Sequence, residues 1–265
     1  MNQVVLITGA SSGIGKACAE YLGQRDYRVY GTSRYAPLEV TAAGPFQMIR
    51  MDVTDDESVA RGVGLVVERE GRLDVVVNNA GVALVGPIED VTLDEARLHL
   101  ETNFFGVLRV CKAVLPIMRE QHAGHIINIS SLAGIVSAAY QGVYSAGKFA
   151  VEGLTEALRT EVRHFGIKVA LIEPGDVRTQ DCRTKILRTQ AYAEYYNNSV
   201  QVYESDEEHG YPMEEIAALV ERIIQNPNPG LRHLCGQPIQ TLGAALKNWV
   251  PYGFFEWALA QIYKF

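Results

Sequence analysis

Residues 4–15 read Val-Val-Leu-Ile-Thr-Gly-Ala-Ser-Ser-Gly-Ile-Gly, and this stretch decides the fold. Residues 4–7 are an apolar run typical of a buried strand, and an amphipathic pattern over residues 14–23 predicts a helix. Glycines between them let the backbone turn sharply and approach a pyrophosphate, which the N–H groups and dipole of the helix attract. We therefore predict a dinucleotide-binding turn made by Gly9, Ser11, Ser12, Gly13, Ile14 and Gly15.

The alternative phosphate-binding turn, the P-loop, does not fit this stretch. A P-loop needs four residues between its first glycine and the Gly-Lys pair, followed by a hydroxyl that binds magnesium. Five residues separate Gly9 from the pair Gly15-Lys16, and Ala17 stands where the hydroxyl belongs. The P-loop is therefore excluded.

The same alternation of short apolar runs and amphipathic stretches continues along the chain and predicts crossover units. Thr54 is expected to cap its helix with Glu57 in a capping box, and Pro116 is expected to interrupt the long helix near its end. The further strands are expected at residues 27–32, 46–51, 73–77, 125–129 and 167–172, with a last one at 231–235, and the further helices at 54–70, 93–119 and 144–165.

This order predicts an α/β fold, a three-layer Rossmann arrangement in which a doubly wound parallel sheet carries helices on both faces. Neither a repeat nor a linker divides the chain, so we expect a single domain over residues 1–265. Residues 181–265 lose the regular pattern and are expected to form a variable substrate lid and a C-terminal tail.

Composition narrows the class of protein. Apolar residues make up 48% and charged residues 21%, with a net charge of −7, so we expect a globular protein without nucleic acid as a partner. The four cysteines and six histidines show no metal spacing, so no metal site is expected. With neither a signal peptide nor an apolar run of membrane-spanning length, we expect a cytoplasmic protein with reduced thiols and no integral membrane segment.

Residues at the end of the second strand indicate which cofactor, NAD or NADP, the protein binds. An NAD site places a carboxylate there for the ribose 2′-hydroxyl, but residues 29–38 contain no acid and instead hold Arg34. An arginine at this point suits the 2′-phosphate of NADP, so NADP is expected and NAD is less favoured. Asp52, followed by Val53 at the end of the third strand, is placed to meet the adenine amino group.

Six motifs now fall in order, and together they resemble the short-chain dehydrogenase/reductase family in its single-domain branch. They are the turn at residues 8–15, Asn78-Asn79-Ala80-Gly81, Asn103 with Gly106, Ser130-Ser131, Tyr144 with Lys148, and Pro174-Gly175 through Thr179. Residues 149–153 after the Tyr-Lys motif make the chain look most like the hydroxysteroid and retinol dehydrogenases of that family.

The resemblance implies a role for each motif. Tyr144 would be the general acid/base, Lys148 would lower the pKa of its phenol and hold the nicotinamide ribose, and four-residue spacing places both on one helix face. Ser131, thirteen residues before Tyr144, would polarise the carbonyl, with Ser130 as its neighbour. Asn103 would bend its helix and hold a relay water. The cofactor cleft would be lined by Asn79, Ala80 and Gly81 and, near the nicotinamide, by Pro174, Gly175, Val177 and Thr179, besides Tyr144 and Lys148.

The expected reaction is NADP-dependent hydride transfer between the nicotinamide and a carbonyl or secondary alcohol of a small hydrophobic substrate that is steroid-, retinoid- or ketone-like. The alternatives are a 3-ketoacyl reductase, a catalytically silent NADP-binding sensor, and a sugar-nucleotide epimerase, whose glycine spacing differs. A homodimer or homotetramer is implied, joined through the helices at residues 93–119 and 144–165. The aromatic tail is expected to pack on the domain or a subunit, or to contact a membrane or lipid.

Overall fold

The apolar runs form one eight-stranded sheet, described by a computed structural model over residues 2–178, 183–247 and 249–263. Seven strands are parallel, and short β3 (Thr41–Ala43) lies antiparallel to β4 at one edge. The parallel order is β10 (Arg232–Cys235), β8 (Ile167–Pro174), β7 (Gly124–Ile129), β5 (Val75–Asn78), β1 (Gln3–Ile7), β2 (Tyr27–Ser33) and β4 (Phe46–Arg50). This order confirms the doubly wound sheet.

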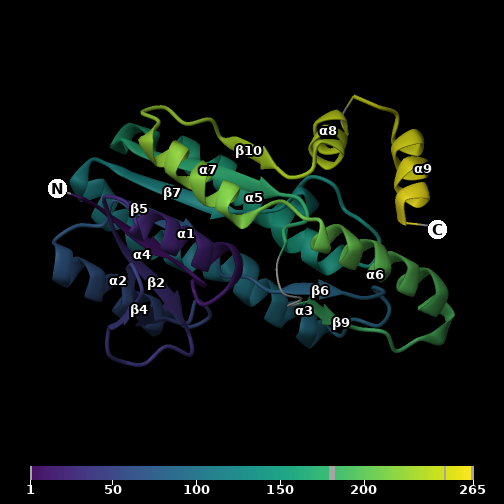
Figure 1. The fold of residues 1–265 in the computed structure, drawn as a ribbon, viewed down its shortest axis with the longest axis horizontal. Coiled ribbons are helices and arrows are strands. Elements are labelled where there is room, and N and C mark those ends of the chain that lie inside the picture. Colours follow the sequence, from purple (N-terminus) through teal and green to yellow (C-terminus); the bar gives the residue numbers. More distant parts are fainter. Residues whose placement is uncertain (1, 179–182, 248, 264–265) are drawn as a thin grey trace.

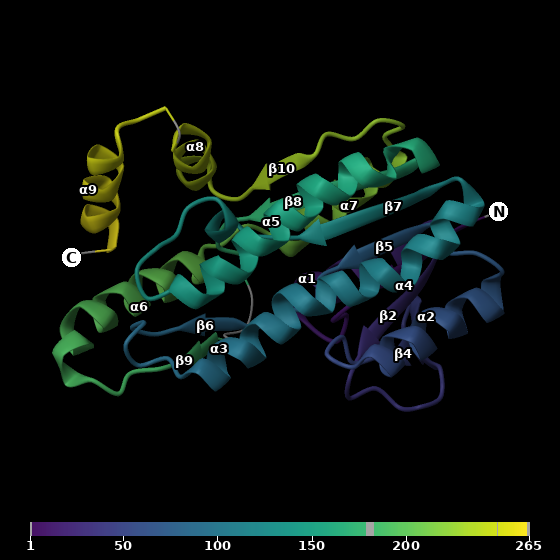
Figure 2. The ribbon, with the colours of Figure 1, turned by 180° about the vertical axis from the view of Figure 1, so that it is seen from behind.

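Helices cover both faces of the sheet and complete three layers (Figures 1 and 2). One face packs against α2 (Asp56–Glu70), α4 (Gly106–Gln121) and α5 (Gly142–Val162), and the other against α1 (Gly13–Gly23) and α7 (Met213–Gln225). Each helix turns an apolar stripe inward, and the central strands are buried on both sides, as parallel strands must be. The predicted Rossmann architecture is confirmed.

The direction in which the chain winds through the sheet reverses at β1, and a crevice forms at this point. Ile7 at the end of β1 lies opposite Gly31 of β2 on one side and Val77 of β5 on the other. The connections that leave β1 and β5 therefore diverge beyond the carboxyl ends of the strands, where open α/β sheets bind their ligands.

The helix expected from Thr54 begins one residue later, so the predicted capping box is wrong. Asp55 is the N-cap, and its carboxylate accepts the backbone N–H of Ser58 at 2.5 Å. Thr54 instead donates its hydroxyl to Asp52 Oδ1 at 2.8 Å. The carboxylate of Asp55 is a stronger acceptor for the helix N–H groups than a hydroxyl that already has a partner.

The long helix expected over residues 93–119 is interrupted, but not at Pro116. It consists of α3 (Leu93–Leu100), a five-residue π-helix (Glu101–Phe105) centred on Asn103, and α4. Pro116 lies inside α4, which continues to Gln121. Val114 and Met118 on either side of Pro116 are buried in the core, so packing holds the helical path despite the lost hydrogen bond.

The last third of the chain contains more regular secondary structure than its sequence pattern predicted. A two-stranded sheet pairs β6 (Ala83–Val85) with β9 (Arg183–Lys185), and α6 (Ala193–Glu208), α8 (Pro238–Leu246) and α9 (Tyr252–Tyr263) follow. Short 3₁₀ turns lie at Leu132–Gly134, Arg163–Phe165 and Gln190–Tyr192. Figure 1 shows α8 and α9 at one end of the molecule, beyond the carboxyl ends of the strands.

Three of the four cysteines, Cys18, Cys111 and Cys235, are buried free thiols, whereas Cys182 lies outside the described residues. Their burial raises the pKa of each described thiol to about 12. None of the helices in the described part of the chain is long and apolar enough to cross a membrane.

Candidate active site

A cavity of about 1450 Å³ opens at the carboxyl ends of the strands and gathers most of the predicted site residues. Gly15 and Asn103 lie behind its wall, and Thr179 falls outside the described residues. The predicted residues that line it are Gly9, Ser11, Ser12, Gly13, Ile14, Arg34, Asp52, Val53, Asn79, Ala80, Gly81, Ser131, Tyr144, Lys148, Pro174, Gly175 and Val177.

Side chains from two strands hold the glycine turn in shape. The hydroxyl of Thr8 accepts the backbone N–H groups of Asn79 and Ala80, both at 2.9 Å. The Asn79 amide donates to the carbonyls of Thr8 and Gly9 at 2.9 and 3.1 Å. A Cβ on Gly15 would lie 2.3 Å from the Asn79 amide nitrogen, so Gly15 serves packing rather than ligand contact.

The turn leaves room for a phosphate group. Gly13 has a positive φ of 55°, and a Cβ there would meet no atom within 4 Å. Beside it Ser12 begins α1 without a capping side-chain bond, so the first N–H groups of the helix remain available. The buried Thr32 hydroxyl in the same cavity wall has no hydrogen-bond partner. These features fit a dinucleotide.

Arg34 lies at the outer end of the cavity, exposed to solvent, with its guanidinium 4.9 Å from the ring centre of Tyr35. Asp52 lies nearby, and its Oδ1 accepts the backbone N–H of Thr54 at 3.0 Å. Lys16 and Thr54 also line this end, although no motif in the sequence indicated a binding role for them. The cavity thus has a cationic rim where an adenosine phosphate would lie.

Tyr144 and Lys148 stand one turn apart near the start of α5, on the face that lines the cavity. The ammonium of Lys148 is 5.8 Å from the Tyr144 ring centre and donates to the Ile129 carbonyl at 2.9 Å. Burial lowers the pKa of Lys148 to about 8, and the carboxylate of Glu152 opposes that shift. A cation is therefore held against the phenol ring in a setting of low dielectric.

Asn103 is buried behind the cavity and ties three segments together. Its Oδ1 accepts the backbone N–H of Val82 and its amide donates to the Val82 carbonyl, both at 2.8 Å. The same amide lies 2.7 Å from Nε2 of His99, whose ring stands edge-on to that of Tyr144 at 5.8 Å. Burial first, and then the charge of Lys148, lower the pKa of His99 to about 4, so its ring is neutral and accepts the amide hydrogen.

Ser130 and Ser131 directly follow β7 and differ in their surroundings. Ser130 is buried, with its backbone N–H bonded to the Ile172 carbonyl. Ser131 is half-buried, accepts the Ala133 N–H at 3.0 Å and donates to the Pro174 carbonyl at 3.3 Å. Both contact the cavity, and the greater exposure of Ser131 supports its choice as the substrate-facing hydroxyl.

Comparisons with known proteins show the family to which the chain belongs. The family model for short chain dehydrogenase matches residues 3–190. The chain is 41% identical to a 3-ketodihydrosphingosine reductase of Bacteroides thetaiotaomicron over 98% of both chains. It is 36% identical to retinol dehydrogenase 8 of Bos taurus over 87% of this chain and 80% of that one. A short-chain dehydrogenase from Streptomyces avermitilis superposes with a TM-score of 0.83 at 34% identity, over 98% of this chain and 97% of that one.

The chain belongs to the short-chain dehydrogenases. It is an oxidoreductase of that family, whose members act on CH–OH or carbonyl groups with a nicotinamide cofactor, and the expected likeness to its retinol-dehydrogenase members is confirmed.

Behind the Tyr-Lys motif this short-chain dehydrogenase has a cluster of charges in which Glu152 and Glu173 are buried, whereas Arg232 and Glu156 reach the solvent. Nη1 of Arg232 bonds Glu152 and Glu173, each at 2.5 Å, and Nη2 bonds Glu156 at the same distance. Glu173 is fully buried, and desolvation followed by the charge of Glu152 raises its pKa to about 7. No motif in the sequence indicated this cluster, because its members come from α5, β8 and β10.

The far side of the cavity is built by the last third of the dehydrogenase. Within the segment expected to form the lid, Tyr192 bonds Glu89 and Tyr196 bonds the Val85 carbonyl, and neither lines the cavity. Later residues of α6 line it instead, among them Tyr203, whose hydroxyl donates to the Ala139 carbonyl at 2.8 Å. The remaining wall comes from α8, α9 and their junction. Apart from Gln240 of α8 it is largely apolar: Ile239, Gly243, Ala244, Leu246, Val250, Phe254, Phe255, Ala258, Leu259 and Ile262.

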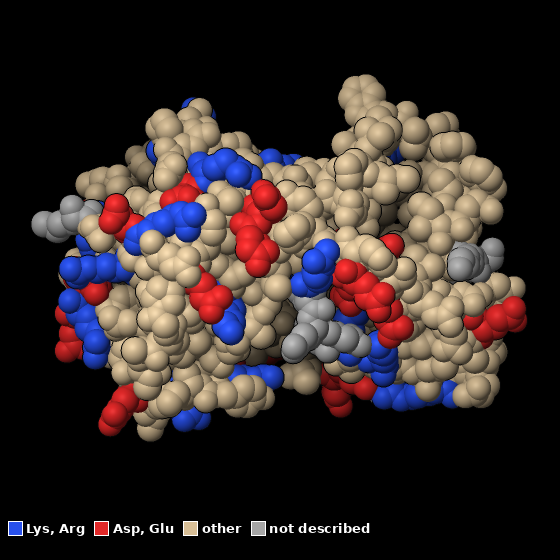
Figure 3. Space-filling view, in the orientation of Figure 1, with Lys and Arg blue, Asp and Glu red and all other residues tan. Residues whose placement is uncertain are grey.

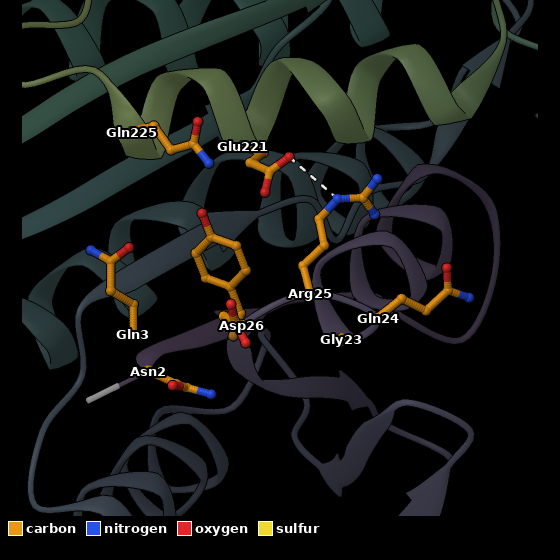
Figure 4. Close-up of a pocket in the computed structure, with 9 residues that line it drawn as sticks. Asn2, Gln3, Gly23, Gln24, Arg25, Asp26, Glu221 and Gln225 are labelled. Atoms are coloured by element: carbon orange, nitrogen blue, oxygen red, sulfur yellow. Dashed lines mark ion pairs between the residues drawn. The ribbon is translucent and has the colours of Figure 1, made fainter.

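A second hollow, of about 870 Å³, lies at the opposite edge of the sheet, where β1 and β2 begin (Figure 4). Arg25 points across it to Glu221 of α7 at 3.5 Å, which fastens the α1–β2 turn to that helix. It contains none of the predicted site residues. The predicted site residues therefore gather at the cavity of about 1450 Å³ and not at this hollow.

Proposed function

We propose that this short-chain dehydrogenase uses NADPH to reduce the carbonyl group of a hydrophobic, lipid-like substrate. One observation carries the proposal: a single cavity joins the glycine turn and Arg34, the Tyr144–Lys148 pair, and an apolar wall. A cofactor lying from Arg34 toward Lys148 would leave the apolar end free for a substrate.

A bound nicotinamide cofactor would supply the hydride that adds to the carbonyl carbon of the substrate. The hydroxyl of Ser131 orients the carbonyl oxygen by a hydrogen bond, and Tyr144 donates its proton to that oxygen. The ammonium of Lys148 stabilises the phenolate that remains. Asn103 and the neutral His99 act as positioning residues, because they fix the π-helix against the back of Tyr144.

The preference for NADPH rests on charge. Arg34 is an exposed cation on the rim of the cavity, and residues 29–38 contain no carboxylate to bond a ribose 2′-hydroxyl. A 2′-phosphate would accept charge-assisted hydrogen bonds from its guanidinium. NADH lacks this group and would bind more weakly.

The substrate class rests on the wall made by α8 and α9. Its aliphatic and aromatic side chains offer few hydrogen bonds, so they favour a long alkyl chain or a fused ring system. The relative named a 3-ketodihydrosphingosine reductase spans almost the whole chain, which supports a long-chain ketone over a small polar one.

We also expect the dehydrogenase to form dimers or tetramers through α3, α4 and α5. Large apolar side chains are exposed on α3, on the π-helix between α3 and α4, and on α5: Leu93, Leu98, Phe105 and Phe149. A second subunit that covered them would remove this apolar surface from water.

The test follows NADPH oxidation by its absorbance with 3-ketodihydrosphingosine, retinal, oestrone and a short 3-ketoacyl thioester, using Tyr144→Phe as control. We expect turnover with a lipid ketone that is lost in the variant, which should still bind NADPH. Turnover with the thioester alone would favour a ketoacyl reductase, and tight NADPH binding without turnover of any of the four would favour a sensor. Activity retained by Tyr144→Phe would refute the proposed proton donor.

A further inference from the structure

Helix α9 is apolar on every side, yet it lies at the surface. Between Tyr252 and Tyr263 its only charged residue is Glu256, and none of its residues is buried. A helix that is apolar all round is normally enclosed by protein or by lipid. Its fixed contacts are with α6, where the rings of Tyr263 and Tyr203 lie 5.0 Å apart. One side of α9 faces the cavity, and the other side faces outward.

The exposed apolar residues of α8, α9 and the segment between them form one surface, which we call the tail patch. It consists of Ile239, Leu242, Leu246, Trp249, Tyr252, Phe254, Trp257 and Ile262, each between 43% and 85% exposed. Residues 238–263 carry only two charges, and Lys247 turns toward the domain, where it donates to the Ile135 carbonyl beside the ring of Phe149. The corresponding region of Figure 3, at the upper right, is almost entirely without charged atoms.

The tail patch is continuous with the cavity. Ile239, Leu246, Phe254 and Ile262 belong to both, because each lines the cavity and is also exposed at the surface. An apolar substrate can therefore move from the outer surface to the site along apolar side chains without entering water. Trp249, Tyr252 and Trp257 belong to the tail patch alone and do not line the cavity.

We propose that the tail patch docks on the surface of a lipid bilayer and that the substrate enters the cavity from the membrane. Tryptophan and tyrosine favour the boundary between headgroups and acyl chains, and a patch with almost no charge suits this position without a specific lipid headgroup. Contact is peripheral, since only side chains of α8, α9 and their junction enter the lipid. The inference that the substrate comes from the membrane rests on the proposed function, whereas docking of the tail patch on the membrane does not.

A second copy of the chain is the other candidate occupant, and the structure favours it less. A copy seated on the tail patch would cover the residues shared with the cavity and so close the opening that the substrate needs. The exposed apolar residues of α3 and the π-helix, Leu93, Leu98 and Phe105, offer a separate surface for subunit contact, since α3 lies apart from α8 and α9 in Figures 1 and 2.

The chain provides its own probe, because its only two tryptophans, Trp249 and Trp257, both belong to the tail patch. The experiment adds phosphatidylcholine vesicles to the full chain and records tryptophan emission, quenching by brominated acyl chains, and flotation with the vesicles. We expect a blue shift, quenching and flotation. A tryptophan spectrum that stays unchanged and a protein that does not float would refute docking.

Two variants make the test specific. Leu242→Gln with Trp249→Gln changes tail-patch residues outside the cavity and keeps Trp257 as the probe, and it should weaken vesicle binding at least tenfold. Leu38→Gln with Ile88→Gln removes equally exposed aliphatic residues elsewhere and should bind as the wild type does. Equal loss in both pairs would overturn the assignment. So would a blue shift that depends on protein concentration without vesicles, since that indicates a second copy.

Activity separates this inference from the proposed function. With a short water-soluble ketone the tail-patch variant should match the wild type, and with a long-chain ketone presented in vesicles it should be at least tenfold slower. Vesicle binding without turnover of any ketone would leave docking intact and refute the reductase. Equal turnover of the vesicle-borne ketone by variant and wild type would refute entry from the membrane.

Discussion

Replacing Arg34 by alanine should weaken NADPH binding and leave NADH binding nearly unchanged. A hydrogen bond to a charged group contributes about 1.5–3 kcal/mol. Because Arg34 is exposed, solvent screens the interaction and the lower part of that range applies, about 1.5–2 kcal/mol. This loss corresponds to a rise of about 10- to 30-fold in the Kd for NADPH. Arg34→Glu should weaken it further, since it places a like charge beside the 2′-phosphate.

The assay titrates each variant with NADPH and NADH and follows the fluorescence of the reduced nicotinamide at low and high salt. Discrimination should shrink as salt rises, because Arg34 meets its phosphate near solvent. Arg61→Ala, which removes an exposed arginine of α2 that does not line the cavity, is the matched control. If Arg34→Ala weakens NADH and NADPH equally, the guanidinium does not read the 2′-phosphate and the reasoning from charge is wrong.

Three further predictions concern the site and its support. Ser131→Ala should lower kcat about 100-fold and Ser130→Ala much less, because Ser131 is the more exposed hydroxyl; the reverse order in steady-state kinetics would exchange their roles. Lys148→Met should abolish turnover yet stabilise the fold by up to about 3 kcal/mol at pH 7, as measured by urea unfolding. Because the folded pKa of about 8 lies below the unfolded value of 10.5, the buried ammonium destabilises the folded state below pH 8. Above about pH 10.5 the lysine is neutral in both states, so the gain in stability should vanish. Arg232→Met should destabilise the fold by about 1.5–3 kcal/mol at pH 9, where Glu173, whose pKa is about 7, is ionised and loses its partner. The loss should be smaller at pH 5, where Glu173 carries a proton; a loss in thermal melting that is independent of pH would contradict this reasoning.

Much of the fold followed from sequence because its signals are local. The run at residues 4–7, the glycine turn and the amphipathic stretch after it each carry their own period, and parallel crossovers leave few ways to assemble them. The cofactor turn and Tyr144 with Lys148 converge on one cavity because parallel strands present their carboxyl ends at the same edge.

What the sequence missed depends on contacts between distant segments. Strands β3, β6 and β9 have three residues each, too few to show a period, and β6 is defined only by pairing with β9 about a hundred residues later. The capping error at Thr54 arose because its hydroxyl is taken by Asp52, which no spacing rule reveals. The Arg232 cluster joins residues 59 to 80 positions apart, so only the assembled sheet shows it.

The hydroxyl of Thr8 bonds backbone groups 71 and 72 residues further along the chain. The glycine turn therefore reaches its final shape only after β5 has paired with β1, although the turn itself is among the first segments synthesised. Loop closure over such a separation is slow compared with local helix formation. Nicotinamide fluorescence during refolding should consequently recover after most helical signal has returned, so that cofactor capture marks the completion of the central sheet.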